Sequence, residues 1–142
     1  MWWIYALLSA LFAALTAIFA KAGIKGVDSD LATAIRTVVI LIIAWGIALV
    51  RGSAEHIGSL NRTNWIFLIL SGCATGLSWI FYFKALQLGK VSQVAPVDKL
   101  SVALAIILAV VFLKEPLSWK SALGALLIIA GTIVLILPEH AA

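Results

Sequence analysis

Four ionised side chains lie within or beside long apolar stretches of this sequence: Arg36, Lys84, Asp98 and Lys99. An ionised group deep in a bilayer costs roughly 2.5–3.5 kcal/mol on insertion scales, so such a residue usually lines a cavity or has a charged partner. Asp98 is the carboxylate best placed inside an apolar run, where it can carry a proton or pair with a cation. These four residues therefore form a candidate charge network for binding a solute or a proton within a membrane.

We expect Lys84 and Asp98 to approach each other, because they lie near the facing ends of two consecutive apolar runs. Consecutive helical side chains point about 100° apart, so we do not expect Asp98 and Lys99 to be each other's main partner. Other roles stay open for these residues. The long side chains of Arg36 and Lys84 could snorkel to the lipid headgroups, and Asp98, which follows Pro96, could cap the start of a helix.

Aromatic and hydroxyl side chains extend this candidate site. Trp79, Phe81, Tyr82 and Phe83 form a cluster that could face lipid, although Trp79 lies well inside its apolar run and is the best candidate of the four to line a cavity. Ser101 falls on the same helical face as Asp98. The predicted solute cavity comprises Trp79, Tyr82, Lys84, Asp98 and Ser101.

The elements that position these residues are expected to be membrane-spanning helices. The 142 residues are 64% hydrophobic and only 11% charged, less than half the charged share of a soluble domain. Five apolar runs of about 20 residues are each long enough to cross a bilayer as a helix. They are expected at about residues 3–22, 31–50, 65–88, 94–113 and 117–137. The sequence thus predicts an all-α integral membrane protein with five transmembrane helices in a single domain, residues 1–142.

Polar residues at the breaks indicate where helices begin. Ser29 or Asp30 is suited to cap the second helix. Pro116, which follows Glu115 in a tight turn, is placed to open the last helix at its first turn.

Small residues such as Gly72 and Gly76 allow helices to approach closely, either within the chain or with a second copy.

Several function classes are unlikely from composition alone. The ten Lys and Arg residues occur singly rather than in a basic patch, which argues against nucleic-acid binding despite the net charge of +4. The two histidines and the single cysteine have no metal-ligand spacing, and no nucleophile motif is present. We therefore expect no enzyme, no metal and no other cofactor.

Cations flank the five spans in nearly equal numbers on the two sides of the membrane. Four Lys or Arg residues lie on the N-terminal side of the membrane. The other side has three in clear loops, and six when Arg36, Lys84 and Lys99, which lie inside the helix ends, are also counted. Because orientation follows this asymmetry, a weak bias permits both orientations. This suggests an antiparallel homodimer, which would reproduce an inverted-topology repeat. A single orientation with a slight bias is the alternative.

Local motifs follow one another along the five runs in a recognisable order: Ile18-Phe19-Ala20-Lys21, Ala34-Ile35-Arg36, Tyr82–Leu86, Val94-Ala95-Pro96, Leu113–Leu117 and the glycine-spaced Gly124–Thr132. In their order and spacing over nearly the whole chain they resemble the EamA domain of the drug/metabolite transporter superfamily. The stretch Val97–Ser101 resembles a subgroup of short, single-domain members.

The usual members of that family have ten helices in two inverted five-helix halves around a central cavity, and they move small metabolites, amino acids or drugs, often outward. The resemblance implies that this chain is one half of an inverted-repeat transporter fold, completed by a partner. It further implies a secondary transporter, exporting by alternating access, in a prokaryotic inner or plasma membrane. It matches Pro96 to the family's helix-four proline and Glu115 to its acidic turn residue.

Two other functions stay open. The chain could be a non-transporting membrane subunit that packs against a larger partner through its small residues. It could also be a small multidrug exporter, although the cations near Asp98 count against a site for cationic drugs.

Overall fold

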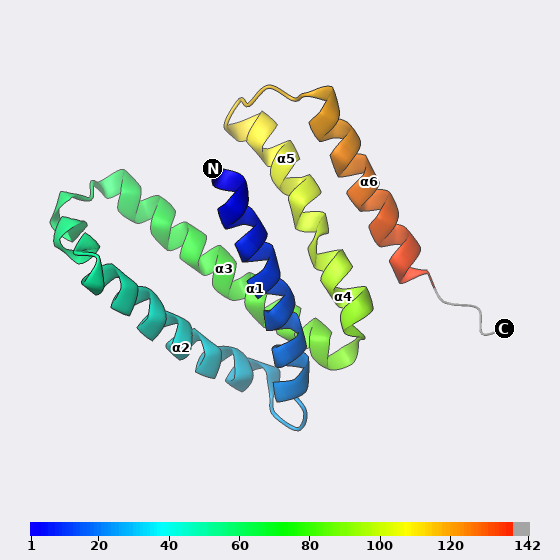
Figure 1. The fold of residues 1–142 in the computed structure, drawn as a ribbon, viewed down its shortest axis with the longest axis horizontal. Coiled ribbons are helices and arrows are strands. Elements are labelled where there is room, and N and C mark those ends of the chain that lie inside the picture. The colour runs from blue at the N-terminus through cyan, green and yellow to red at the C-terminus, as the bar shows by residue number, and fades with distance from the viewer. Residues whose placement is uncertain (138–142) are drawn as a thin grey trace. The chain divides into compact units, whose positions relative to one another are not determined.

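Every regular element of the computed structural model, which describes residues 1–137, is a helix. Figure 1 shows them in chain order: α1 (Trp2–Gly23), α2 (Ser29–Val50), the short 3-10 helix η1 (Ser53–Ser59), α3 (Arg62–Leu88), α4 (Val91–Asp98), α5 (Leu100–Phe112) and α6 (Trp119–Ile136). Taking α4 and α5 as one stretch, five segments are long and apolar enough to cross a membrane. The all-α class with five spans is confirmed, and the helix ends lie within three residues of the expected positions.

The helices group into two compact units. Unit 1 contains α1, α2, η1 and α3, and unit 2 begins at Gly89 and contains α4, α5 and α6. The expectation of a single domain over residues 1–142 stays a prediction.

Asp28, rather than Ser29 or Asp30, caps α2. Its Oδ1 accepts hydrogen bonds from the backbone nitrogens of Asp30, at 2.9 Å, and Leu31, at 3.2 Å. A cap side chain accepts from the backbone nitrogens two and three residues later, and Asp28 has this spacing, whereas Ser29 and Asp30 already lie inside the helix. Ser29 is instead fully buried in unit 1. The helix therefore begins two residues earlier than the apolar pattern indicated.

The last helix also begins at a different residue from the one expected. Ser118 is its N-cap and accepts a hydrogen bond from the backbone nitrogen of Ser121 at 3.0 Å. Pro116 therefore precedes the cap and does not occupy the first turn of α6. The prediction was wrong because an oxygen-bearing side chain can satisfy a free N–H at the helix start, whereas proline only fixes the backbone.

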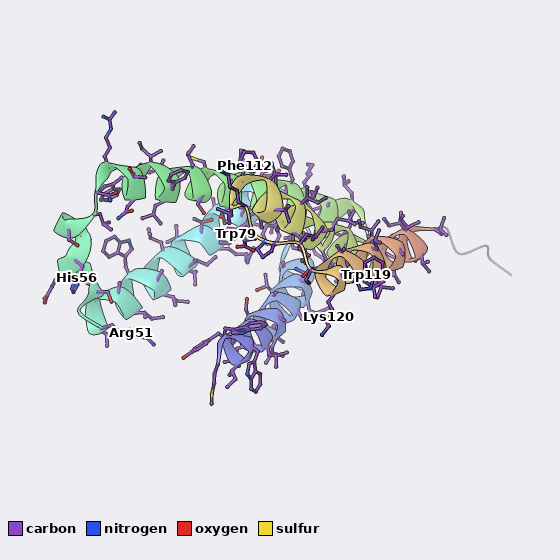
Figure 2. The ribbon with its side chains drawn as sticks, turned by 90° about the horizontal axis from the view of Figure 1, so that it is seen from above. Arg51, His56, Trp79, Phe112, Trp119 and Lys120 are labelled. Atoms are coloured by element: carbon purple, nitrogen blue, oxygen red, sulfur yellow. The ribbon has the colours of Figure 1, made fainter. Side chains whose placement is uncertain are left out.

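The core of unit 1 lies where the loop from α1 to α2 meets the end of α3. The residues buried there are Ala17, Ala20, Ile24, Ser29, Thr33, Phe83 and Leu86. Two long-range hydrogen bonds fasten this end: Lys21 Nζ donates to the carbonyl oxygen of Leu86, and Gln87 Nε2 donates to that of Val27 at 2.6 Å. In Figure 2, α1 diverges from α2 and α3 away from this end. Unit 1 is thus packed at one end and open at the other.

In unit 2, the span Val91–Phe112 is interrupted at Lys99, where one helix from 94 to 113 was expected. Pro96 lies inside α4 and has no N–H to donate, so it weakens the helix at this point. The Pro96 carbonyl oxygen accepts from the Lys99 backbone nitrogen at 3.0 Å. It also shares the Thr132 hydroxyl proton, because Thr132 Oγ1 lies 3.2 Å from it and 2.8 Å from the Ile128 carbonyl oxygen of its own helix. Thr132 is buried on α6. It therefore ties α6 to the interrupted span.

This tie can be tested with Thr132→Val, which keeps the side-chain shape but removes the hydroxyl. We expect a loss of about 0.5–1 kcal/mol in unfolding free energy, the usual range for a hydrogen bond between membrane helices. The measurement is unfolding of the purified protein in mixed micelles. Thr75→Val is the matched control, because the exposed Thr75 hydroxyl bonds only to Ser71 within its own helix. Equal stability losses in the two variants would contradict a structural role for the contact between α6 and α4.

Candidate functional site

Arg36 lies about two turns inside α2, and its guanidinium extends from α2 and packs against α3. Its Cζ is 4.1 Å from the centre of the Phe83 ring and 5.9 Å from that of Trp79. These two aromatic residues are four apart and therefore share a face of α3, and Figure 2 shows Trp79 on the side of α3 toward α2. Of the two roles left open for Arg36, the structure favours a partner within the protein over snorkelling to the headgroups.

The two rings offset the charge of Arg36 but do not replace its hydrogen bonds. A desolvated cation–π contact contributes about 2 kcal/mol, and Arg36 has two such rings beside it. The rings also leave hydrogen bonding unsatisfied, because the Arg36 Nη1 atom is buried and has no acceptor in the described part of the chain. An oxyanion is the group that would complete this arrangement.

A pocket of about 400 Å³ adjoins Arg36 and is lined entirely by residues of unit 1. The second half of α1, the loop to α2 and the first two turns of α2 form its walls, which are mostly apolar and include Phe19, Ile24 and Ile35. The volume is in the range of small-molecule sites. A smaller hollow of about 270 Å³ lies near Lys25 and Gln87. Unit 1 alone therefore supplies a solute-sized pocket next to an intramembrane cation.

Asp98 and Lys99 form an ion pair in unit 2, with Lys99 Nζ 3.2 Å from Asp98 Oδ2. This corrects the expectation that consecutive residues cannot be each other's main partner. That expectation assumed a continuous helix, whereas α4 ends at Asp98 and the chain turns at Lys99 before α5 begins. The capping role is also wrong for Asp98, because it is the last residue of α4 and Lys90 occupies the N-cap.

The other predicted site residues are distributed over both units. Tyr82 is half-buried and packs edge-to-face on Phe83, with ring centres 5.5 Å apart. Lys84 is exposed on α3, and Ser101 is exposed on α5. Because Lys84 belongs to unit 1 and Asp98 to unit 2, their pairing and the joint cavity stay predictions.

The turn between α5 and α6 holds its shape through the backbone. Lys114 adopts a left-handed conformation with φ of 55°, and the Glu115 nitrogen donates to the Ala109 carbonyl oxygen at 3.2 Å. The Glu115 side chain is exposed.

Among the described residues, no group of three His, Cys, Asp or Glu is placed to hold a metal ion.

Sequence reasoning missed Phe83 as the main partner of Arg36. Phe83 is only 1% exposed, so the expectation that it could face lipid is wrong, whereas Phe81 is 69% exposed. The spacing of Trp79 and Phe83 contained a usable signal, since residues four apart present one face to a neighbouring helix. The pocket had no comparable signal, because its walls come from three segments with ordinary apolar sequences.

Comparison with known proteins identifies the family. A protein of Sinorhizobium sp. named "Uncharacterized transporter in cobO 3'region" is 48% identical over 134 residues, which cover 94% of this chain and 95% of that protein. No solved structure matches the chain significantly. The family described as "EamA-like transporter family" matches residues 1–137. With nearly its whole length matched and five helices suited to a membrane, the chain belongs to the EamA-like transporter family.

Proposed function

We propose that this multi-pass membrane protein is one half of a secondary transporter, which exports small metabolites, amino acids or related solutes by alternating access as an antiparallel homodimer. The observation that carries the proposal is the odd number of spans, five, in a member of a transporter family. The Sinorhizobium relative is matched over 95% of its own length and is therefore about as long as this chain. Two copies in opposite orientations would supply the two inverted halves of a transporter.

Membership of a transporter family points to transport rather than to catalysis. Polar groups inside the spans support transport over a purely structural subunit. Arg36 and the Asp98–Lys99 pair are costly in lipid, and intramembrane ionisable residues usually serve a solute or proton pathway. A subunit that only packs against a partner would have no use for them.

One observation favours a packing partner of some kind. As at Gly46, Gly124 and Gly131, a Cβ atom added at Gly72 or Gly76 would meet no described atom beyond the backbone of its own helix within 4 Å. This face of α3 therefore offers room for the close approach of another helix. Both a second copy and an unrelated larger protein fit this requirement. Solute flux into liposomes that contain only this chain, measured with a metabolite panel, distinguishes them, because a non-transporting subunit would give none.

Dual orientation is tested with reporters fused to the C-terminus. We expect both a reporter active only in the cytoplasm and one active only outside it to give signal in cells, because the flanking cations are nearly balanced. Adding two lysines to the loop between α2 and α3 should shift the ratio of the two signals. Signal on one face alone would end the antiparallel proposal.

The ion pair at the break between α4 and α5 is our candidate for proton coupling. Protonation of Asp98 would remove its charge and release Lys99, whose side chain is 56% exposed. The pair lies where the span is interrupted, and discontinuous helices are where many transporters bind coupling ions. We therefore assign Asp98 as the proton carrier and Lys99 as its internal counter-ion.

Asp98→Asn tests this assignment. We expect the variant to lose pH-gradient-driven uptake into proteoliposomes, at least tenfold, but to retain exchange of labelled for unlabelled solute without a gradient. The reason is that an amide cannot carry the proton but preserves the shape. Glu115→Gln, in the exposed turn between α5 and α6, is the matched control and should behave as wild type. Unchanged gradient-driven uptake in the Asp98 variant would remove Asp98 from the coupling mechanism.

A further inference from the structure

We propose that the pocket beside Arg36 binds a small organic carboxylate, with the guanidinium holding the carboxylate and the pocket walls enclosing an apolar body. This deepens the proposed function and rests on it, since it names the class of solute that unit 1 would take. Three features of the described residues carry the inference: the unsatisfied cation, the composition of the pocket walls and the placement of the guanidinium over aromatic rings.

The first feature is the missing acceptor at Arg36. Its Nη1 is buried without a hydrogen-bond partner in the described part of the chain. Aromatic faces attract the charge but do not accept hydrogen bonds as well as an oxygen does. Buried donors in proteins nearly always find an acceptor, from the protein, from water or from a ligand. An oxyanion in the pocket compensates the guanidinium charge, and a rotation of the Arg36 side chain would bring the buried Nη1 within reach of it.

The second feature is the composition of the pocket. Apolar side chains such as Phe19, Ile24 and Ile35 dominate its walls, Arg36 supplies one positive charge, and no carboxylate lines it. Thr16, which carries a hydroxyl, also lines the pocket. One cation, one hydroxyl and apolar walls fit an anion with an apolar body.

The third feature is the placement of the guanidinium over aromatic rings. The Arg36 Cζ lies over the Phe83 ring, 4.1 Å from its centre, and 5.9 Å from the centre of the Trp79 ring. The N–H groups of a guanidinium lie in its plane, in a fork that matches the two oxygens of a carboxylate. Arginine suits this task better than lysine, because its planar fork forms two parallel hydrogen bonds.

The test is equilibrium binding to the full chain in phosphatidylcholine nanodiscs, with phenylacetate and the neutral phenylacetamide as matched probes and empty nanodiscs as the blank. We expect phenylacetate to bind at least tenfold more tightly than phenylacetamide. Arg36→Gln should remove this preference while it still binds phenylacetamide as the wild type does, which shows that the variant is folded, and Arg36→Lys should retain part of the preference. Arg51→Gln is the matched control: Arg51 is exposed at the other end of α2 (Figure 2) and should not affect the preference.

Equal affinity for the two probes in the wild type, or a carboxylate preference that survives in Arg36→Gln, would overturn the proposal. A second arm separates a solute from a lipid headgroup as the source of the anion. If phosphatidylglycerol in the nanodisc displaces phenylacetate from the wild type competitively, the site belongs to a lipid and the solute proposal fails. We expect no such displacement.

Binding is measured without transport, so the two proposals fail separately. Carboxylate binding without flux in proteoliposomes would contradict the transporter function and leave the site standing. Flux of other solutes without carboxylate preference would contradict the site and leave the transporter function standing.

Discussion

Lipid offers a protein neither hydrogen-bond donors nor acceptors, and this constraint governs the placement of every polar group in the chain. Backbone groups are satisfied within the helices, and the threonines at positions 33, 37, 75 and 132 donate to carbonyl oxygens of their own helix. The Arg36 side chain does not bond to a carbonyl oxygen of α2 in this way. Its charge must be compensated by a neighbouring helix, and the Phe83 and Trp79 rings of α3 provide part of that compensation. The donor that the rings leave unsatisfied is the basis of the proposed carboxylate site.

The two units meet the same constraint differently. In unit 1, long side chains reach from one element to another: Lys21 of α1 bonds to the end of α3, and Gln87 of α3 bonds to the loop between α1 and α2. In unit 2, the backbone itself is irregular at Pro96, and Thr132 supplies a hydrogen bond to its carbonyl oxygen. Asp98 and Lys99 neutralise each other at this irregular point. Membrane transporters place irregular helices where a substrate or ion binds, and unit 2 contains such an irregular point.

Much of this could be predicted from the sequence. The five spans follow from the lengths of the apolar runs, because only a helix can cross a bilayer with so few polar residues. Side-chain pairing could not be predicted equally well. The Asp98–Lys99 pair depends on an interruption at Lys99 that an apolar pattern does not reveal, and the burial of Phe83 depends on which face of α3 meets α2. The caps at Asp28 and Ser118 were missed because apolar runs mark the lipid-facing stretch and not the first hydrogen-bonded residue.

The long-range hydrogen bonds at the end of α3 have a consequence for biosynthesis. Lys21 precedes its acceptor Leu86 by 65 residues, and the Val27 carbonyl precedes its donor Gln87 by 60. A chain is made from its N-terminus, so α1 and α2 can enter the membrane before the last turn of α3 exists. Helices insert first and associate afterwards. Until α3 is complete, the Lys21 ammonium must stay at the water interface, and α1 is free to move relative to α2. The third helix thus sets the moment at which the first becomes fixed.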